Sequence, residues 1–205
     1  MTNYSWDTGT YIGHIIFNNS ISSDIMNTID SSAPHCDSFF RTRASNGTHY
    51  LCSTAMSEIR HRRTLMETTI QALIMKIKTG KFSPSPNIDV GRLMNLSTTL
   101  SSFSKEDVVL ALASINGDIT AREINLKTVC NFQKVAQRLS VQDEQLLKPH
   151  FEKPGDLCIF SATIIIHNQM CECNLITTDK HFKNIESKLD CFPHKIPTIE
   201  FVWAY

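Results

Sequence analysis

The chain has 205 residues, which is enough for one domain with an inserted segment and too few for two large domains. Apolar residues make up 41% of the sequence and charged residues 20%, close to the globular average, so wholesale disorder is excluded. Lys and Arg together number 20, as do Asp and Glu, and the resulting net charge of zero excludes a strongly basic nucleic-acid-binding protein. A polyanionic partner would have to be held by a local basic patch or by metal ions.

Nothing in the sequence points to a membrane or to secretion. No run approaches the ~18 to 20 apolar residues that a membrane span requires. The first residues, MTNYSWDTGTYIGH, lack the basic and apolar parts of a secretion signal. The seven cysteines have no framework spacing, which is typical of reduced thiols in the cytosol. We therefore expect a cytoplasmic protein without a membrane partner.

The first strong apolar run covers residues 11–17 and is rich in β-branched and aromatic side chains. It stops at Asn18-Asn19-Ser20, and a short apolar run bounded by turn formers predicts a buried strand. Apolar residues at helical spacing predict a short helix over 21–29, and the polar stretch 30–49 is expected to be irregular.

A second strand is predicted over 50–52, where small polar residues again follow an apolar segment. Either Ser53 or Thr54 can cap a helix that starts at Ala55, and apolar residues recur at helical spacing as far as about Lys78. Gly80 is expected to end this long helix.

The middle of the chain, residues 88–150, has the periodicity of helices throughout. The predicted helices cover 90–96, 105–115, 120–139 and 141–147. Ser104 and Asp107 resemble a capping box at the start of the second of them.

The final third of the chain returns to an alternation of helices and strands. The predicted elements are a helix over 156–169, a strand over 174–177, a helix over 180–189 and a strand over 197–203. Short apolar strands that alternate with helices predict an α/β fold, with a central parallel sheet covered on both faces.

Three carboxylates follow or precede the predicted strands closely. Glu58 lies about one helical turn after the second strand, Asp179 follows the third, and Asp156 begins the helix that leads into it. Sites in open parallel sheets lie beyond the carboxyl ends of the strands, so these carboxylates should meet there. Carboxylates repel one another unless a cation neutralises them, and Mg²⁺ or Mn²⁺ prefers such oxygen ligands. Taken singly, each has a structural alternative as a helix cap or as a partner of a helix dipole.

Three segments resemble the PIN-domain ribonucleases, a family that includes the VapC-like toxins of bacterial toxin–antitoxin pairs. They are Leu51-Cys-Ser-Thr-Ala-Met-Ser-Glu58-Ile59, Asp156-Leu-Cys-Ile-Phe-Ser-Ala162 and Leu175-Ile-Thr177-Thr-Asp179-Lys-His-Phe182. The first is similar to the family's second strand and helical glutamate. The other two are similar to its terminal signature, Asp-x-x-Ile-x-Ala and then Leu-Val-Thr-x-Asp-x-x-Phe, which is the most specific part of the match.

The resemblance implies a three-layer α/β/α fold and a single PIN-like domain over residues 1–205. Within it, residues 61–149 would be an enlarged, mainly helical segment, longer than in compact family members. The implied activity is that of an Mg²⁺- or Mn²⁺-dependent endoribonuclease, which cuts single-stranded or loop RNA. The implied partners are RNA, an antitoxin protein if the chain is such a toxin, and a second copy of the chain in a homodimer.

The first family motif departs from its pattern at one position. Ile15-Ile-Phe17-Asn18-Asn-Ser20-Ile21 fits the motif, but Asn18 stands where the family has its leading metal-binding aspartate. By resemblance, Asp156, Asp179 and Glu58 would hold the ion and act in catalysis together with position 18, supported by Ser20 and Thr177. An amide oxygen carries no negative charge, so the metal should bind more weakly. Either an Asp-to-Asn change disarms a toxic nuclease, or this is a naturally weakened or inactive member.

The densest basic cluster follows Glu58 directly and contains Arg60, Arg62 and Arg63. One or two of these arginines, and Lys180 beside Asp179, could contact RNA phosphate, although each could equally be a solvated surface residue. An alternative function comes from another class: a catalytically inactive PIN-fold module that binds RNA or a protein partner. Asn18 is the feature that favours this alternative.

Overall fold

The computed structural model describes residues 2–44, 46–129, 133–135, 138–183 and 185–204. Side chains are described for the same residues except 44, 122–129, 133–135 and 204. None of the helices in this described part of the chain is both long and apolar enough to cross a membrane.

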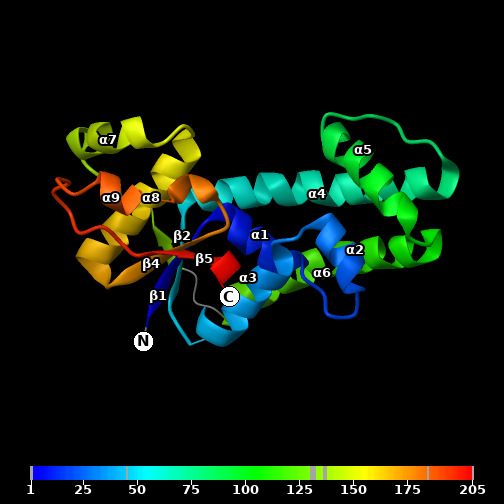
Figure 1. Cartoon of the computed structure of the whole chain (residues 1–205), viewed down its shortest axis with the longest axis horizontal. Helices are drawn as coiled ribbons and strands as arrows, with labels where there is room; N and C mark the ends of the chain where they lie inside the picture. Colours follow the sequence, from blue (N-terminus) through cyan, green and yellow to red (C-terminus); the bar gives the residue numbers. More distant parts are fainter. Residues whose placement is uncertain (1, 45, 130–132, 136–137, 184, 205) are drawn as a thin grey trace.

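A parallel sheet forms the centre of the fold (Figure 1). Its four central strands lie in the order β2 (His49–Cys52), β1 (Asn3–Trp6), β4 (Cys173–Thr177) and β5 (Ile199–Phe201), and β3 (Gln133–Val135) pairs with β2 outside them. Every pairing is parallel, and Ser5 is in register with Tyr50 on one side and Leu175 on the other. Because parallel strands point the same way, their carboxyl ends all lie at one edge of the sheet.

Helices connect the strands, as parallel pairing requires. They are α1 (Thr8–Ile16), α2 (Ser23–Ile29), α3 (Ala33–Phe39), α4 (Ser53–Thr79), α5 (Val90–Thr99), α6 (Lys105–Val129), α7 (Val141–Leu147), α8 (Pro154–Ile165) and α9 (Ile185–Lys188). A short 3-10 turn, Lys180–Phe182, follows β4.

Side chains of β1 point alternately to two layers of helices. Trp6 packs edge-to-face on Tyr11 of α1 with ring centroids 6.4 Å apart, and Tyr4 packs in the same way on Phe39 of α3 at 5.7 Å. Ser5 lies between them in sequence and accepts a hydrogen bond of 2.8 Å from the Thr163 hydroxyl of α8. Helices α1 and α3 therefore cover one face of the sheet and α8 covers the other, which confirms the predicted α/β fold.

Residues 11–16 do not form a strand but belong to helix α1, with Phe17 as its C-cap, and the first strand lies earlier, at Asn3–Trp6. Helix α1 contacts α3, α4, α6 and β4, so almost all of its residues are buried. A helix buried on all sides carries apolar residues at consecutive positions rather than on one face. Periodicity cannot distinguish a short run of this kind from a buried strand, and the strand prediction is wrong for that reason.

Two further stretches differ from the prediction. Residues 30–49, predicted to be irregular, contain α3 and a π-helical turn, Phe40–Ala44. The two helices predicted over 105–115 and 120–139 are one continuous helix, α6, which ends at Val129. Residues 133–135 form β3, while 130–132 and 136–137 lie outside the described residues. A strand of three residues is too short to show a clear alternation of apolar and polar side chains, so the sequence pattern does not distinguish it from the helices around it.

The two ends of α4 illustrate how local chemistry sets a helix boundary. Cys52, rather than Ser53 or Thr54, caps the first turn, because its Sγ accepts a hydrogen bond of 3.3 Å from the backbone N–H of Ala55. Gly80 ends the helix as predicted, with a φ of 76° in the left-handed region that glycine adopts without strain.

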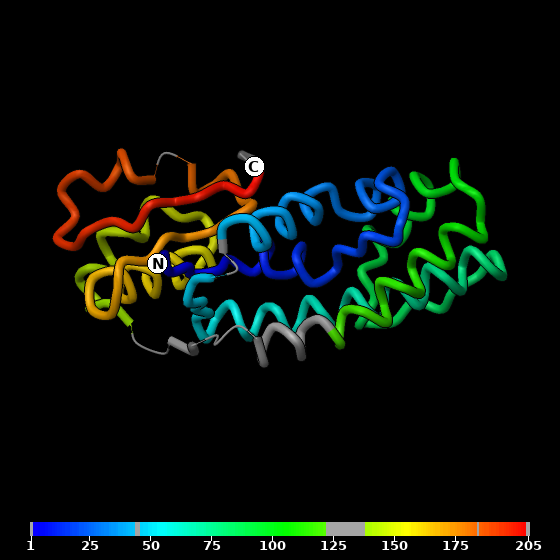
Figure 2. Tube along the Cα trace, turned by 90° about the horizontal axis from the view of Figure 1, so that it is seen from below, coloured from blue at the N-terminus to red at the C-terminus, as the bar shows by residue number. Residues whose placement is uncertain are grey.

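Helices α4, α5 and α6 extend away from the sheet (Figures 1 and 2) and make up most of the predicted helical segment 61–149. Helix α4 packs against both of the others. Each helix contributes a fully buried leucine: Leu73 from α4, Leu93 from α5 and Leu112 from α6. The extension therefore has a core of its own, continuous with that of the sheet.

We expect Leu112→Ala to lower the free energy of unfolding by about 2 to 5 kcal/mol, because it removes buried methyl groups and leaves a cavity. Leu110 is a matched control on the same helix, since it is 69% exposed and its replacement by Ala should change stability by less than about 0.5 kcal/mol. Denaturant unfolding of both variants checks this. Equal losses would mean that α6 does not pack as described.

Candidate functional site

Asp7 follows strand β1 directly and occupies the N-cap position of α1. Its carboxylate is buried, and its Oδ2 accepts a hydrogen bond of 2.9 Å from the hydroxyl of Thr177, the last residue of the neighbouring strand β4. The carboxyl end of β1 therefore carries a buried carboxylate that is held against the end of β4.

Two more carboxylates meet at the same edge of the sheet. Asp179 comes two residues after β4, and Asp156 lies in the first turn of α8. Possible ligand atoms of Asp156, Asp179 and His181 all lie within 4.8 Å of one another. Thr177 links this group to Asp7, because its hydroxyl also accepts a hydrogen bond of 2.9 Å from the backbone N–H of Asp179.

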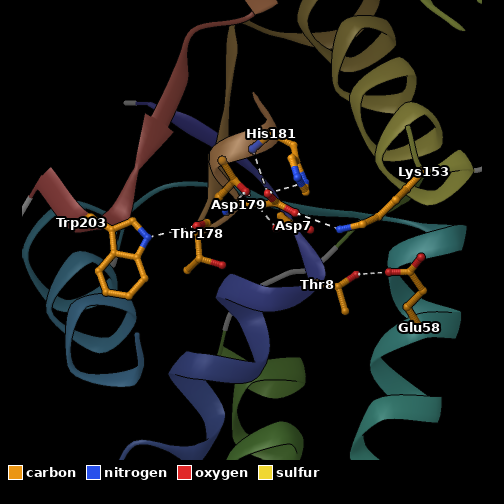
Figure 3. A network of polar contacts seen from close by, with 9 residues as sticks. Asp7, Thr8, Glu58, Lys153, Thr178, Asp179, His181 and Trp203 are labelled. Atoms are coloured by element: carbon orange, nitrogen blue, oxygen red, sulfur yellow. Dashed lines mark hydrogen bonds and ion pairs between the residues drawn. The ribbon is translucent and has the colours of Figure 1, made fainter. Parts of the chain in front are cut away.

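Glu58 reaches this region from the second turn of α4. The hydroxyl of Thr8, the first residue of α1, donates a hydrogen bond of 2.8 Å to its Oε2 (Figure 3). Gly155, next to Asp156 on α8, approaches Glu58 so closely that a Cβ at this position would overlap its Oε1. The glycine therefore allows the start of α8 to lie against the Glu58 carboxylate.

Burial raises the pKa of Asp7 from its ordinary value of 3.8 to about 6. The hydrogen bond from Thr177 opposes this shift in the pKa, whereas the charges of Asp156 and Asp179 add to it. The charges of the other two aspartates therefore make a smaller contribution than burial to the raised pKa of Asp7.

The pKa values of the other two aspartates move in opposite directions. Burial raises the pKa of Asp156, Lys153 opposes the shift, and the charges of Asp179 and Glu58 add to it. Burial alone would also raise the pKa of Asp179, but the backbone hydrogen bond from His181 and the charge of Lys153 hold it below its ordinary value. Lys153 Nζ lies 3.4 Å from Oδ2 of Asp179, and His181 Nδ1 lies 2.9 Å from its Oδ1 (Figure 3).

This donor set fits a hard divalent cation. Asp7, Glu58, Asp156 and Asp179 bring carboxylate oxygens from four different elements to one edge of the sheet. Burial is the main cause of the raised pKa values of Asp7 and Asp156, and the neighbouring carboxylates add to it; two positive charges would relieve that repulsion. Mg²⁺ and Mn²⁺ prefer carboxylate oxygens, so either ion suits the group.

Asn18 and Ser20, in contrast, lie beyond the far end of α1, roughly 14 Å along that helix from Asp7. The Asn18 amide donates hydrogen bonds to Ser114 and to Asp118 of α6, and its Oδ1 accepts from the backbone N–H and the hydroxyl of Ser20. The expectation that Asn18 and Ser20 follow a strand is therefore wrong, because the run before them is a helix. Asp7 is the residue that follows the first strand.

A cleft of about 360 Å³ lies beside the carboxylates. Gly9 and Thr178 line it next to the site, and Arg62 of α4 and Arg92 of α5 line it from the helical extension. The Arg92 guanidinium donates a hydrogen bond of 3.3 Å to the carbonyl of Ile29, which helps to fix its position. Two guanidinium groups near a carboxylate group suit a phosphate chain that passes along the cleft.

Asp30 and Asp89 also line this cleft, but both have structural roles. Asp89 caps α5 by accepting a hydrogen bond of 2.8 Å from the backbone N–H of Arg92. Asp30 accepts hydrogen bonds from the backbone N–H and the hydroxyl of Ser32. These hydrogen bonds occupy part of the acceptor capacity of the Asp30 and Asp89 carboxylates.

The other predicted RNA-binding residues have different surroundings. Arg60 is exposed on α4, and Lys180 is exposed on the turn directly after Asp179. Arg63 is half-buried, and its Nε lies 3.7 Å from a carboxylate oxygen of Glu67 one helical turn further on, which partly neutralises its charge. Of the predicted arginines, Arg62 is the one that lines the cleft.

Asp7, Arg92 and Lys153 are site residues that the sequence analysis missed. For Asp7 a signal was present, because residues 3–6 alternate polar and aromatic side chains, as a strand does, and an aspartate follows at once. Arg92 and Lys153 have no comparable signal, since their approach to the site depends on how α5 and the segment before α8 pack.

No protein-family model matches the chain, and no curated protein or solved structure is significantly similar to it. An α/β fold hosts many unrelated functions and does not by itself identify an activity. A function must therefore rest on the chemistry of the site.

We expect Asp7→Asn to raise stability at neutral pH, because it removes a buried charge. The folded-state pKa of about 6 lies above the ordinary 3.8, so between these pH values the folded protein binds more protons and loses stability as pH rises. The gain should reach at most about 3 kcal/mol above pH 6 and vanish below about pH 4. Denaturant unfolding across this range, with a chelator present, measures it.

Asp190→Asn is the matched control, since Asp190 is exposed and lies away from β1 and β4 in the chain. It should leave the pH dependence of stability unchanged. An Asp7→Asn variant that is less stable than the original chain at neutral pH would show that the charged carboxylate stabilises the fold rather than destabilising it.

Proposed function

We propose that this chain is an Mg²⁺- or Mn²⁺-dependent endoribonuclease that cuts single-stranded or loop RNA. The observation that carries the proposal is the cluster of Asp156, Asp179 and His181 at the carboxyl edge of a parallel sheet. Thr177 links Asp7 to this cluster, and Glu58 lies against Gly155 beside it. Carboxylates in mutual repulsion are a costly arrangement, and such arrangements concentrate at functional sites.

The proposal also draws on the resemblance to the PIN-domain ribonucleases. With Asp7 in the leading position, the chain has a strand-end aspartate, a helical glutamate, and the two aspartates of the terminal signature. The explanation that Asn18 disarms a nuclease then becomes unnecessary, because Asn18 is not at the corresponding place. A strand order of β3-β2-β1-β4-β5, all parallel, is compatible with such a fold.

Asp7, Asp156 and Asp179 would hold the ion, with Glu58 as a further ligand. When bound, the ion would activate water for attack on phosphorus and neutralise charge on the phosphate. Thr177 keeps Asp7 and Asp179 in place through its two hydrogen bonds. Arg62 and Arg92 would contact phosphates of the RNA backbone in the cleft, while Asp30 and Asp89 accept hydrogen bonds from backbone N–H groups of the fold.

We expect Mn²⁺ to raise the thermal midpoint of the chain and to support cleavage of a labelled single-stranded RNA. Asp7→Asn should lose both effects, with cleavage falling roughly a hundredfold or more because a ligand charge is lost. Thermal scans and a cleavage assay, each with a chelator control and with Asp190→Asn as the matched variant, test this. Growth should slow when the original chain is expressed, and not when Asp7→Asn is.

Asn18→Asp distinguishes the two candidate positions for the leading aspartate. The change places a carboxylate beside Asp118, so it should lower the thermal midpoint in chelator. It should not alter the Mn²⁺-induced shift or the cleavage rate. Cleavage that appears only in Asn18→Asp would return the leading position to residue 18 and exclude Asp7.

The second candidate function is a catalytically inactive module that binds RNA or a protein such as an antitoxin. The ion pair of Asp179 with Lys153 and the contact of its Oδ1 with His181 Nδ1 favour it, since they satisfy part of the carboxylate without a metal. RNA binding without Mn²⁺ binding or cleavage would establish this function instead. Exposed Leu110 and Met94 on the helical extension offer apolar surface for an antitoxin or for a homodimer.

A further inference from the structure

Another hollow lies beside the turn that follows Asp179. Lys180, Lys183, Phe201 and Trp203 line it, and its volume of about 530 Å³ is within the range of ligand sites. Trp203 is 40% exposed, although a side chain of this size and hydrophobicity is usually covered. An exposed indole and two lysines therefore line the same hollow.

The Trp203 ring is held in place rather than free to turn. Its Nε1 donates a hydrogen bond of 3.0 Å to the carbonyl of Thr178, and the ring of His35 lies 5.1 Å away, centroid to centroid. Figure 3 shows Thr178 between the indole and the aspartates. Thr178 also lines the cleft described above, so one residue connects the Trp203 ring to that cleft.

The charge around Trp203 is positive. Lys180 and Lys183 lie at the two ends of the turn after Asp179, and both are exposed. In the described part of the chain, neither ammonium group has a carboxylate within ion-pair distance. Cationic groups beside a fixed aromatic face match a ligand with phosphates and a flat ring.

We infer that Lys180, Lys183, Phe201 and Trp203 form a binding site for single-stranded RNA, in which one base stacks on Trp203 and the lysines contact the flanking phosphates. A base can lie on an aromatic ring only when it is not stacked inside a duplex, so this site would select single strands. The inference rests on the proposed function for its choice of RNA. It adds the place where the strand is gripped before it passes Thr178 toward the carboxylates.

Binding of a fluorescently labelled single-stranded RNA to the full chain, in chelator, tests the site without any cleavage. We expect Trp203→Ala to weaken binding by at least about fivefold, because base–aromatic stacking is lost. Trp203→Phe keeps a ring and loses the bond to Thr178, so it should retain most of the affinity. Leu146→Ala, which removes an exposed apolar side chain on α7, should change nothing.

The lysines are tested by the salt dependence of the same binding. Each phosphate contact on a single strand contributes about 0.7 to the slope of log affinity against log salt. The double variant Lys180→Ala and Lys183→Ala should therefore reduce the steepness of this salt dependence by about 1.4. Lys78→Ala, at the far end of α4, should leave it unchanged.

Several results would overturn the inference. The RNA affinity could be unchanged in Trp203→Ala, or Trp203→Ala and Trp203→Phe could lose the same amount of affinity. The chain could also bind duplex and single-stranded RNA equally well, or bind anionic lipid vesicles in place of RNA. Failure of the proposed function looks different. If Trp203-dependent RNA binding persists but no Mn²⁺-dependent cleavage occurs, the binding site stands and the nuclease does not.

Discussion

Repulsion among carboxylates at one edge of a parallel sheet is the constraint around which this structure is arranged. Parallel strands bring all their carboxyl ends together, and here those ends carry Asp7 and Asp179, with Asp156 joining from the start of α8. Burial raises the pKa of Asp7 to about 6, and the charges of Asp156 and Asp179 add to this shift. The Thr177 hydroxyl holds the two strand ends together, because it donates a hydrogen bond to the Asp7 carboxylate and accepts one from the backbone N–H of Asp179.

The rest of the fold positions this edge. On one face of the sheet, Trp6 packs on α1 and Tyr4 packs on α3; on the other face, Ser5 accepts a hydrogen bond from α8. Helices α1 and α8, which both begin at the site, are therefore fixed to β1 from opposite faces. Gly155 lets α8 approach Glu58. The extension of α4, α5 and α6 adds Arg62 and Arg92 to the cleft, which Asp30 and Asp89 also line.

Much of this could be predicted from the sequence, and the errors have physical causes. Glu58, Asp156 and Asp179 were predicted as one group because strand ends, capping residues and motif spacing are local signals. Asp7 was missed because α1 is buried on every side and so has the apolar pattern of a strand. The first strand was therefore predicted at residues 11–17, several residues after its actual position. Arg92 and Trp203 depend on tertiary packing, which a single sequence does not record.

The most direct measurement is the titration of the Asp7 carboxyl by carbon NMR, with and without Mg²⁺. Without the ion the carboxyl should titrate near pH 6, because it is buried beside Asp156 and Asp179. With Mg²⁺ bound, its pKa should fall well below that value, since the ion favours the charged form. An Asp7 pKa that stays the same in saturating Mg²⁺ would contradict the account, because the carboxylate would then have no part in holding a cation.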